Sequence, residues 1–105
     1  MLNQVIMVGR LVSDPKVIGL GDEKFTEITL AIPRSYKNKD GEYDTDLVPV
    51  TLWNAIAEHV VEYCKTGDLL GVKGKVECLP DALGDSKVTI VAEKVTFLSS
   101  KSNEE

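Results

Sequence analysis

The sequence has few of the residues on which enzymes, metal sites and disulfide frameworks are built. It contains one histidine, His59, and two cysteines, Cys64 and Cys78, with no C-x-x-C pair and no mixed Cys/His cluster. Catalytic triads and structural zinc sites need more such groups at defined spacings, and two cysteines are too few for a disulfide framework. We therefore expect a protein without catalytic activity, metal or other cofactor, in which both cysteines are reduced and structural.

Long apolar runs and an excess of positive charge are also missing. No stretch of the chain approaches the roughly 18 apolar residues that span a bilayer, and the N-terminus lacks the basic and apolar regions of a secretory signal. These absences predict a cytoplasmic protein with no membrane partner. Asp and Glu number 17 against 12 Lys and Arg, for a net charge of −5, whereas nucleic-acid-binding proteins are usually basic. Because cations act on phosphates only where they approach them, the positions of the cations matter more than their total.

The hydrophobic pattern predicts one domain of five strands and one short helix. The length of 105 residues fits a single domain, which we expect over 1–99, followed by a short disordered end over 100–105. Alternating apolar residues predict strands at 4–11, 25–34, 47–53, 69–77 and 87–98. Apolar residues at helical spacing, with Asn54 as N-cap, predict a helix over 55–65. With its helix between the third and fourth strands, this order fits the OB-fold, a five-stranded Greek-key barrel.

The remaining candidates for function are cations and aromatic rings on the strands and loops. They are Arg10, Arg34, Tyr36, Lys37, Lys39, Trp53, Lys73 and Lys75. Single-stranded nucleic acid is bound by cations that follow the phosphates and by rings that stack on the bases. Two alternating lysines are more often a solvated strand face, and a tryptophan is more often part of a core. However, Trp53 shares a predicted strand face with Leu47 and Thr51 and not with the core residues, and Tyr36 lies in a polar, projecting hairpin loop over 35–46.

Several segments form an ordered set of motifs along the chain. They are Leu2 to Leu11 followed by Asp14-Pro15, residues 29–32 with Arg34-Ser35-Tyr36, Gly41-Glu42, Trp53 with Ala57-Glu58, Gly67 with 71–74, and 91–98. In this order they resemble bacterial single-stranded-DNA-binding proteins. The resemblance implies an OB-fold that assembles as a homotetramer and coats single-stranded DNA with little sequence preference, in replication, recombination, repair or DNA uptake. It implies that Tyr36 and Trp53 stack on bases. It also implies that Arg10, Arg34, Lys37, Lys39, Lys73 and Lys75 lie on segments that face the DNA strand.

The sequence departs from the family pattern where the family is usually aromatic or basic. Leu47 replaces an aromatic residue, Pro49 interrupts an exposed strand face, and Glu77, Leu79 and Asp81 replace a basic and aromatic run. The chain ends at Glu105 without a long linker and acidic tip, so we expect no tail-mediated recruitment of repair proteins. Two alternatives stay open: an OB-fold protein-interaction module with weak or no DNA binding, and an RNA or oligosaccharide ligand, since OB barrels bind all of these.

Overall fold

The computed structural model describes residues 1–19, 21–80 and 82–100 of the chain. Within these ranges the chain forms six strands, one α-helix and one 3-10 turn. They are β1 Val5–Leu11, β2 Lys16–Ile18, η1 Gly21–Glu23, β3 Phe25–Lys37, β4 Tyr43–Leu52, α1 Asn54–Tyr63, β5 Leu69–Pro80 and β6 Ser86–Ser99. Of the predicted C-terminal end at 100–105, only Ser100 lies among the described residues. None of the helices in this part of the chain is long and apolar enough to cross a membrane.

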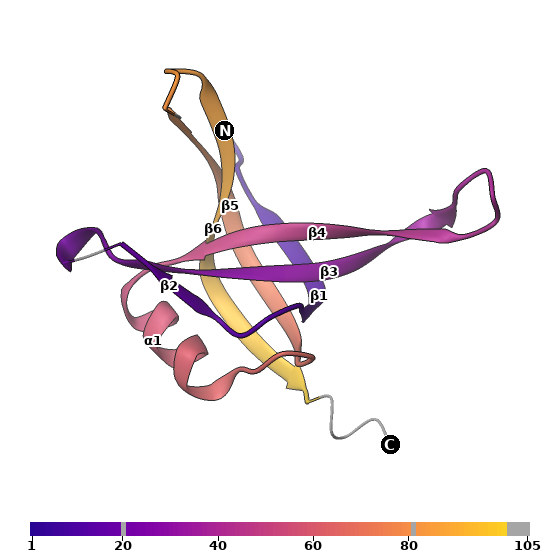
Figure 1. Ribbon diagram of the computed structural model, residues 1–105, viewed down its shortest axis with the longest axis horizontal. Coiled ribbons are helices and arrows are strands. Elements are labelled where there is room, and N and C mark those ends of the chain that lie inside the picture. The colour runs from indigo at the N-terminus through magenta and orange to yellow at the C-terminus, as the bar shows by residue number, and fades with distance from the viewer. Residues whose placement is uncertain (20, 81, 101–105) are drawn as a thin grey trace.

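The five longer strands close into a barrel. The sheet runs in the order β1-β5-β6-β4-β3, and β1 returns to pair with β3 at Arg10↔Ala31 and Leu11↔Leu30. All of these pairings are antiparallel except the short parallel contact between β4 and β6. Figure 1 shows the β3–β4 ribbon running across β1, β5 and β6, with α1 at one end of the barrel. The predicted OB-fold, a five-stranded barrel with one helix, is confirmed.

The helix differs from the prediction in its bounds and its cap. The short strand β2, which pairs with the start of β3, was not predicted because three residues give too little alternation. With β2 counted, α1 lies between β4 and β5, which are the third and fourth of the five predicted strands. The N-cap is Trp53, without a side-chain cap hydrogen bond, and the predicted cap residue Asn54 is the first helical residue. Asn54 has a φ of 54°, a left-handed conformation that asparagine tolerates better than most residues.

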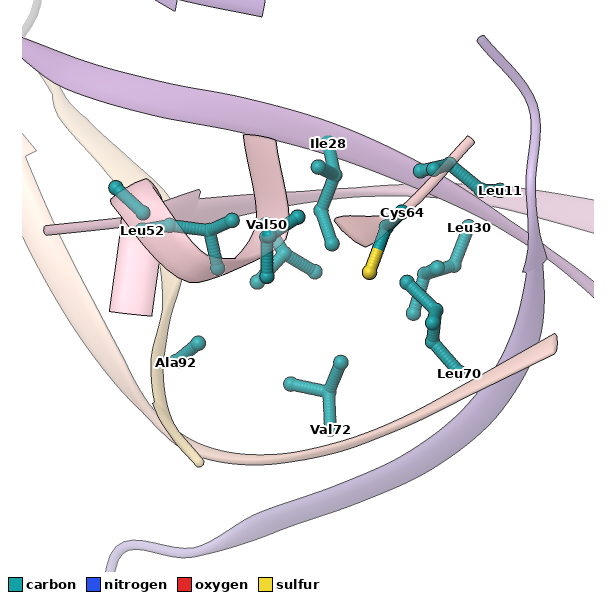
Figure 2. Close-up of a cluster of buried hydrophobic side chains, with 11 residues drawn as sticks. Leu11, Ile28, Leu30, Val50, Leu52, Cys64, Leu70, Val72 and Ala92 are labelled. Atoms are coloured by element: carbon teal, nitrogen blue, oxygen red, sulfur yellow. The ribbon is translucent and has the colours of Figure 1, made fainter. Parts of the chain in front are cut away.

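The barrel interior is filled by the apolar faces of the five longer strands and of α1. The buried cluster consists of Leu11, Ile28, Leu30, Val50, Leu52, Ala57, Val60, Cys64, Leu70, Val72 and Ala92 (Figure 2). Along β1, β3, β4 and β5, the more buried residues alternate with less buried ones over most of each strand. Both cysteines are free, but only Cys64 is in the core. Cys78 is exposed on β5, so the expectation that both are structural was wrong for Cys78.

Two turns at one end of the barrel are fixed by side chains. The Asp14 carboxylate accepts hydrogen bonds from the Thr66 hydroxyl at 2.7 Å and the Thr66 backbone N–H at 3.0 Å. These hydrogen bonds, the hydroxyl first, lower the pKa of Asp14 below its ordinary value. Arg10 Nη1 donates to the Gly67 carbonyl at 3.0 Å. Together these contacts hold the turn after α1 against the end of β1.

A glycine allows β5 and β6 to pack closely where their pairing changes register. The register shifts between Lys73 and Gly74, which is the mark of a β-bulge. A Cβ atom at Gly74 would collide with the backbone carbonyl oxygen of Val91, whereas one at Gly71 would come no closer than 3.7 Å, to the Leu98 side chain. Gly74 is therefore required by packing, and Gly71 is not.

Replacing Gly74 by alanine should destabilise the barrel strongly, because a backbone oxygen cannot move aside as a flexible side chain can. We expect Gly74→Ala to lower the free energy of unfolding by about 3 kcal/mol, measured by urea denaturation. The matched change Gly71→Ala should cost less than about 1 kcal/mol, since alanine is not worse than glycine in a strand. Equal losses in the two variants would contradict this account of the bulge.

The Asp14 contact should make stability depend on acidity. Because its pKa is lower in the folded chain than the unfolded value of about 3.9, the carboxylate stabilises the fold above that pH, and the stabilisation is lost as the pH falls through the folded pKa. The stability difference between wild type and Asp14→Asn, measured by urea denaturation, should therefore be larger at about pH 6 than at about pH 3. In a Thr66→Val background this pH dependence should shrink. A difference independent of pH would show that the contact does not stabilise the charged form.

Candidate nucleic-acid interface

Two strand pairs extend beyond the barrel as projecting ribbons. One is the arm, residues 34–46, formed by the end of β3 and the start of β4, and the other is the β5–β6 hairpin (Figure 1). Asn38 organises the tip of the arm, because its side-chain oxygen accepts the backbone N–H groups of Asp40 and Glu42 at 2.9 and 3.0 Å. Gly41, with a φ of 79°, completes the turn. The predicted projecting hairpin is thus present, and its turn residues are those expected from the sequence.

The Arg34 guanidinium is held by carboxylates of the opposite strand. Its Nε donates to both oxygens of Asp46 at 3.2 and 3.1 Å, and its Nη2 donates to Asp46 Oδ1 at 2.9 Å. Asp44 lies further away, with Oδ2 at 3.9 Å from Nη1. Hydrogen bonding to Asp46 raises the pKa of Arg34, and the same bonds lower the pKa of Asp46. This cation is therefore already paired in the free protein.

The arm carries two exposed tyrosines, one on each of its strands. Tyr36 is 62% exposed, and its hydroxyl lies 3.5 Å from Arg34 Nη1. Tyr43 is 57% exposed, and Lys37 Nζ lies 5.8 Å from the centre of its ring, within the range of a cation–π contact. The structure thus adds Tyr43 to the candidate residues. The signal in the sequence was its place in the same polar loop as Tyr36.

Trp53 lies at the other end of β4, where the strand meets α1. The strand ends at Leu52, so Trp53 is not part of it. Its ring packs against Phe25 with centroids 5.3 Å apart and planes tilted by 45°, and the residue remains 37% exposed. Trp53 therefore offers only part of its surface to a ligand, and it lies apart from the two tyrosines of the arm.

The candidate lysines on β5 face outward, in different surroundings. Lys75 lies opposite Val91, which in turn lies opposite Thr51, so Lys75 shares an outward face with β4. Its Nζ is 3.2 Å from Glu77 Oε2. Lys73 lies opposite Ile6 in the pairing of β5 with β1. Lys39 is exposed near the tip of the arm.

The structure therefore divides the predicted residues into groups. Arg34, Tyr36, Lys37 and Lys39 come together on the arm, Lys75 lies on the outward face beside β4, and Lys73 lies over β1. Arg10 is separate, because its guanidinium contacts the Gly67 carbonyl. Among the residues that the structure describes, no group of three or more His, Cys, Asp or Glu side chains is placed to hold a metal ion. What the surface offers is rings and cations for binding.

The chain is similar in sequence to known proteins. The model of the single-strand binding protein family matches residues 2–98. The chain is 39% identical to single-stranded DNA-binding protein 3 of Listeria innocua, over 98% of this chain and 68% of that protein. It is 35% identical to single-stranded DNA-binding protein B of Bacillus subtilis, over 99% of this chain and 96% of the relative.

Solved structures show the same fold. A Plasmodium falciparum SSB in complex with ssDNA superposes with a TM-score of 0.74 at 20% identity, over 94% of this chain and 96% of that one. A deletion mutant of the single-stranded DNA binding protein from Thermus aquaticus superposes with a TM-score of 0.76 at 24% identity, over 93% of this chain and 51% of that one. At these identities the likeness establishes the shared barrel.

Proposed function

This chain belongs to the single-strand binding protein family, and we propose that it binds and coats single-stranded DNA with little sequence preference. It acts by binding and not by catalysis. The observation that carries the proposal is the family match over nearly the whole barrel, joined to an arm that presents exposed rings among cations. We place the binding domain at 1–99 and its work on DNA in the cytoplasm, in replication, recombination, repair or DNA uptake.

In the proposed complex the bases stack on rings of the arm. Tyr36 and Tyr43 are each more than half exposed, and a ring that stacks on a base contributes about 1–3 kcal/mol without regard to base identity. Trp53 adds a smaller surface, because Phe25 packs against its ring. Stacking on any base explains why little sequence preference is expected.

The phosphates are proposed to follow the cations from the arm across the outward face of β4 to β5. Lys37 and Lys39 lie on the arm, and Lys75 lies on the same outward face as Thr51. Lys73 would extend this path along β5. Arg10 is partly buried and bonded to the Gly67 carbonyl, so we expect it to support the turn after α1 more than the DNA.

We also propose that the chain assembles with copies of itself through β1, and the homotetramer implied by the family resemblance is the state expected. Ile6 and Val8 point outward from β1 and are 71% and 50% exposed. A shallow groove of about 190 Å³ lies beside them, and two lysines, Lys73 and Lys94, stand in its lining with Gly71 and Thr96. Within the described chain, β1 over residues 5–9 pairs only with β5. An apolar face beside an open strand edge is typical of an assembly surface.

Titration with fluorescently labelled oligo-dT tests the binding function. Binding should be selective for single strands over a matching duplex and weaker at about 200 mM than at about 50 mM salt. Replacing Tyr36 by alanine should weaken binding about tenfold, within the range of one lost stacking contact. Tyr63→Ala removes a similarly exposed ring from α1 and should leave the affinity unchanged. Absence of binding at the lower salt would favour a protein-interaction module instead.

Light scattering tests the assembly surface. Wild type should scatter as an oligomer at micromolar concentration, and Ile6→Glu should shift it toward a monomer, because a charge would be buried in the apolar interface. Val17→Glu places the same charge on β2, at another exposed apolar position, and should leave the mass unchanged. A wild-type protein that scatters as a monomer would refute self-assembly.

A further inference from the structure

The arm that is proposed to follow phosphates carries more negative than positive charge. Over residues 34–46 there are three cations, Arg34, Lys37 and Lys39, and four carboxylates, Asp40, Glu42, Asp44 and Asp46. Like charges on the arm and on the DNA backbone repel each other, and a cation releases counterions only where it reaches a phosphate. The positions of the carboxylates therefore bear directly on how DNA would be held.

Asp46 occupies the edge of Arg34 that a phosphate would use. Guanidinium groups recognise carboxylates and phosphates by the same fork, in which adjacent N–H groups donate in parallel to two oxygens. Arg34 Nε and Nη2 already donate to the Asp46 carboxylate at 2.9 to 3.2 Å. The ion pair is exposed, with 41% of the Arg34 side chain and 48% of the Asp46 side chain accessible. A phosphate can therefore reach the guanidinium, but it must compete with Asp46.

The second carboxylate of the cluster is fixed by the turn. Asp44 Oδ1 accepts a hydrogen bond from Asn38 Nδ2 at 3.1 Å. Asn38 is itself held, because its side-chain oxygen accepts backbone N–H groups of the turn. Asp44 thus stays on the side of the arm that carries Arg34, with its other oxygen 3.9 Å from Nη1. The negative charge next to Arg34 is part of the folded arm.

We propose that Asp46, with support from Asp44, is an internal competitor for the DNA phosphates. It pairs with Arg34 in the free protein and thereby limits the affinity and the salt dependence of single-strand binding. The Arg34–Asp46 ion pair also holds the guanidinium beside Tyr36. The Tyr36 hydroxyl lies 3.5 Å from Arg34 Nη1. This inference rests on the proposed function and deepens it, because it names residues that set how tightly and how reversibly the strand is held.

The experiment compares four variants in oligo-dT titrations between about 50 and 200 mM salt. Asp46→Asn removes the competing charge at nearly constant shape, and Asp40→Asn removes the same charge from the tip of the arm, outside the Arg34 ion pairs. We expect Asp46→Asn to tighten binding about fivefold at the lower salt, the scale of an exposed ion pair. Its salt dependence should steepen by about 0.7 in the slope of log K against log salt, the value for one more cation on a single strand. Asp40→Asn should change the affinity less than about twofold, as expected for a screened charge.

Arg34→Gln and the double variant Arg34→Gln/Asp46→Asn show whether the gain passes through Arg34. The inference requires that Asp46→Asn no longer increases the affinity for oligo-dT when Arg34 is replaced, so the double variant should bind no tighter than Arg34→Gln. Equal gains from Asp46→Asn and Asp40→Asn would overturn it, because net charge alone would then explain the effect. A gain that survives in the double variant, or weaker binding by a folded Asp46→Asn protein, would also overturn it.

Two controls separate this inference from the proposed function and from a folding defect. If no variant binds oligo-dT even at the lower salt, the proposed function itself fails and the inference fails with it. If wild type binds and Asp46→Asn binds no better than Asp40→Asn, only the inference fails. If circular dichroism shows that Asp46→Asn does not fold, wild type supplies the test instead. The Arg34 Nε–H resonance of the ¹⁵N-labelled wild-type protein must then shift when oligo-dT is added. An unmoved resonance at saturation would overturn the inference.

Discussion

Closure of a small barrel is the constraint on which the rest of this structure depends. The five longer strands close only because β1 reaches β3, and Gly9 lies where they meet. A Cβ atom there would come within 2.8 Å of Ile32 Cγ1 and 2.9 Å of the Ala31 carbonyl oxygen. Together with Gly74, where β5 approaches the Val91 carbonyl, Gly9 allows strands around a narrow apolar core to approach closely. The closed core then fixes the directions in which the arm and the β5–β6 hairpin leave the barrel (Figure 1).

The surface of this barrel is balanced between binding and repelling nucleic acid. Rings and cations are present on the arm, yet Arg34 is paired with Asp46 and Lys75 with Glu77. Each exposed ion pair is weak by itself, and both place a carboxylate where a phosphate would compete for the cation. A carboxylate that re-forms its ion pair with the cation favours release of the phosphate. With three cations and four carboxylates, the arm shares the acidic balance of the whole chain.

Much of the fold could be predicted because burial imposes a period of two on each strand. Ile28 and Leu30 alternate with less buried neighbours, as do Val50 and Leu52, and the resulting strands were placed correctly. The three residues of β2 are too few to show that period. The contact between Arg34 and Asp46 could not be predicted, since it joins residues twelve positions apart, and the register between Pro33 and Lys37 is irregular. The hydrogen bond from Arg10 to the Gly67 carbonyl likewise spans distant segments, and no spacing in the sequence reveals it.

Single-stranded DNA is proposed to bind the arm and the outward face of β4 and β5. The most direct test is an amide ¹H–¹⁵N correlation spectrum of the ¹⁵N-labelled protein, recorded while oligo-dT is added. The resonances that shift should map to the arm and continue through Leu47 and Thr51 to Lys75, while those of α1 around Tyr63 should stay in place. Shifts confined to α1, or none at all, would contradict it.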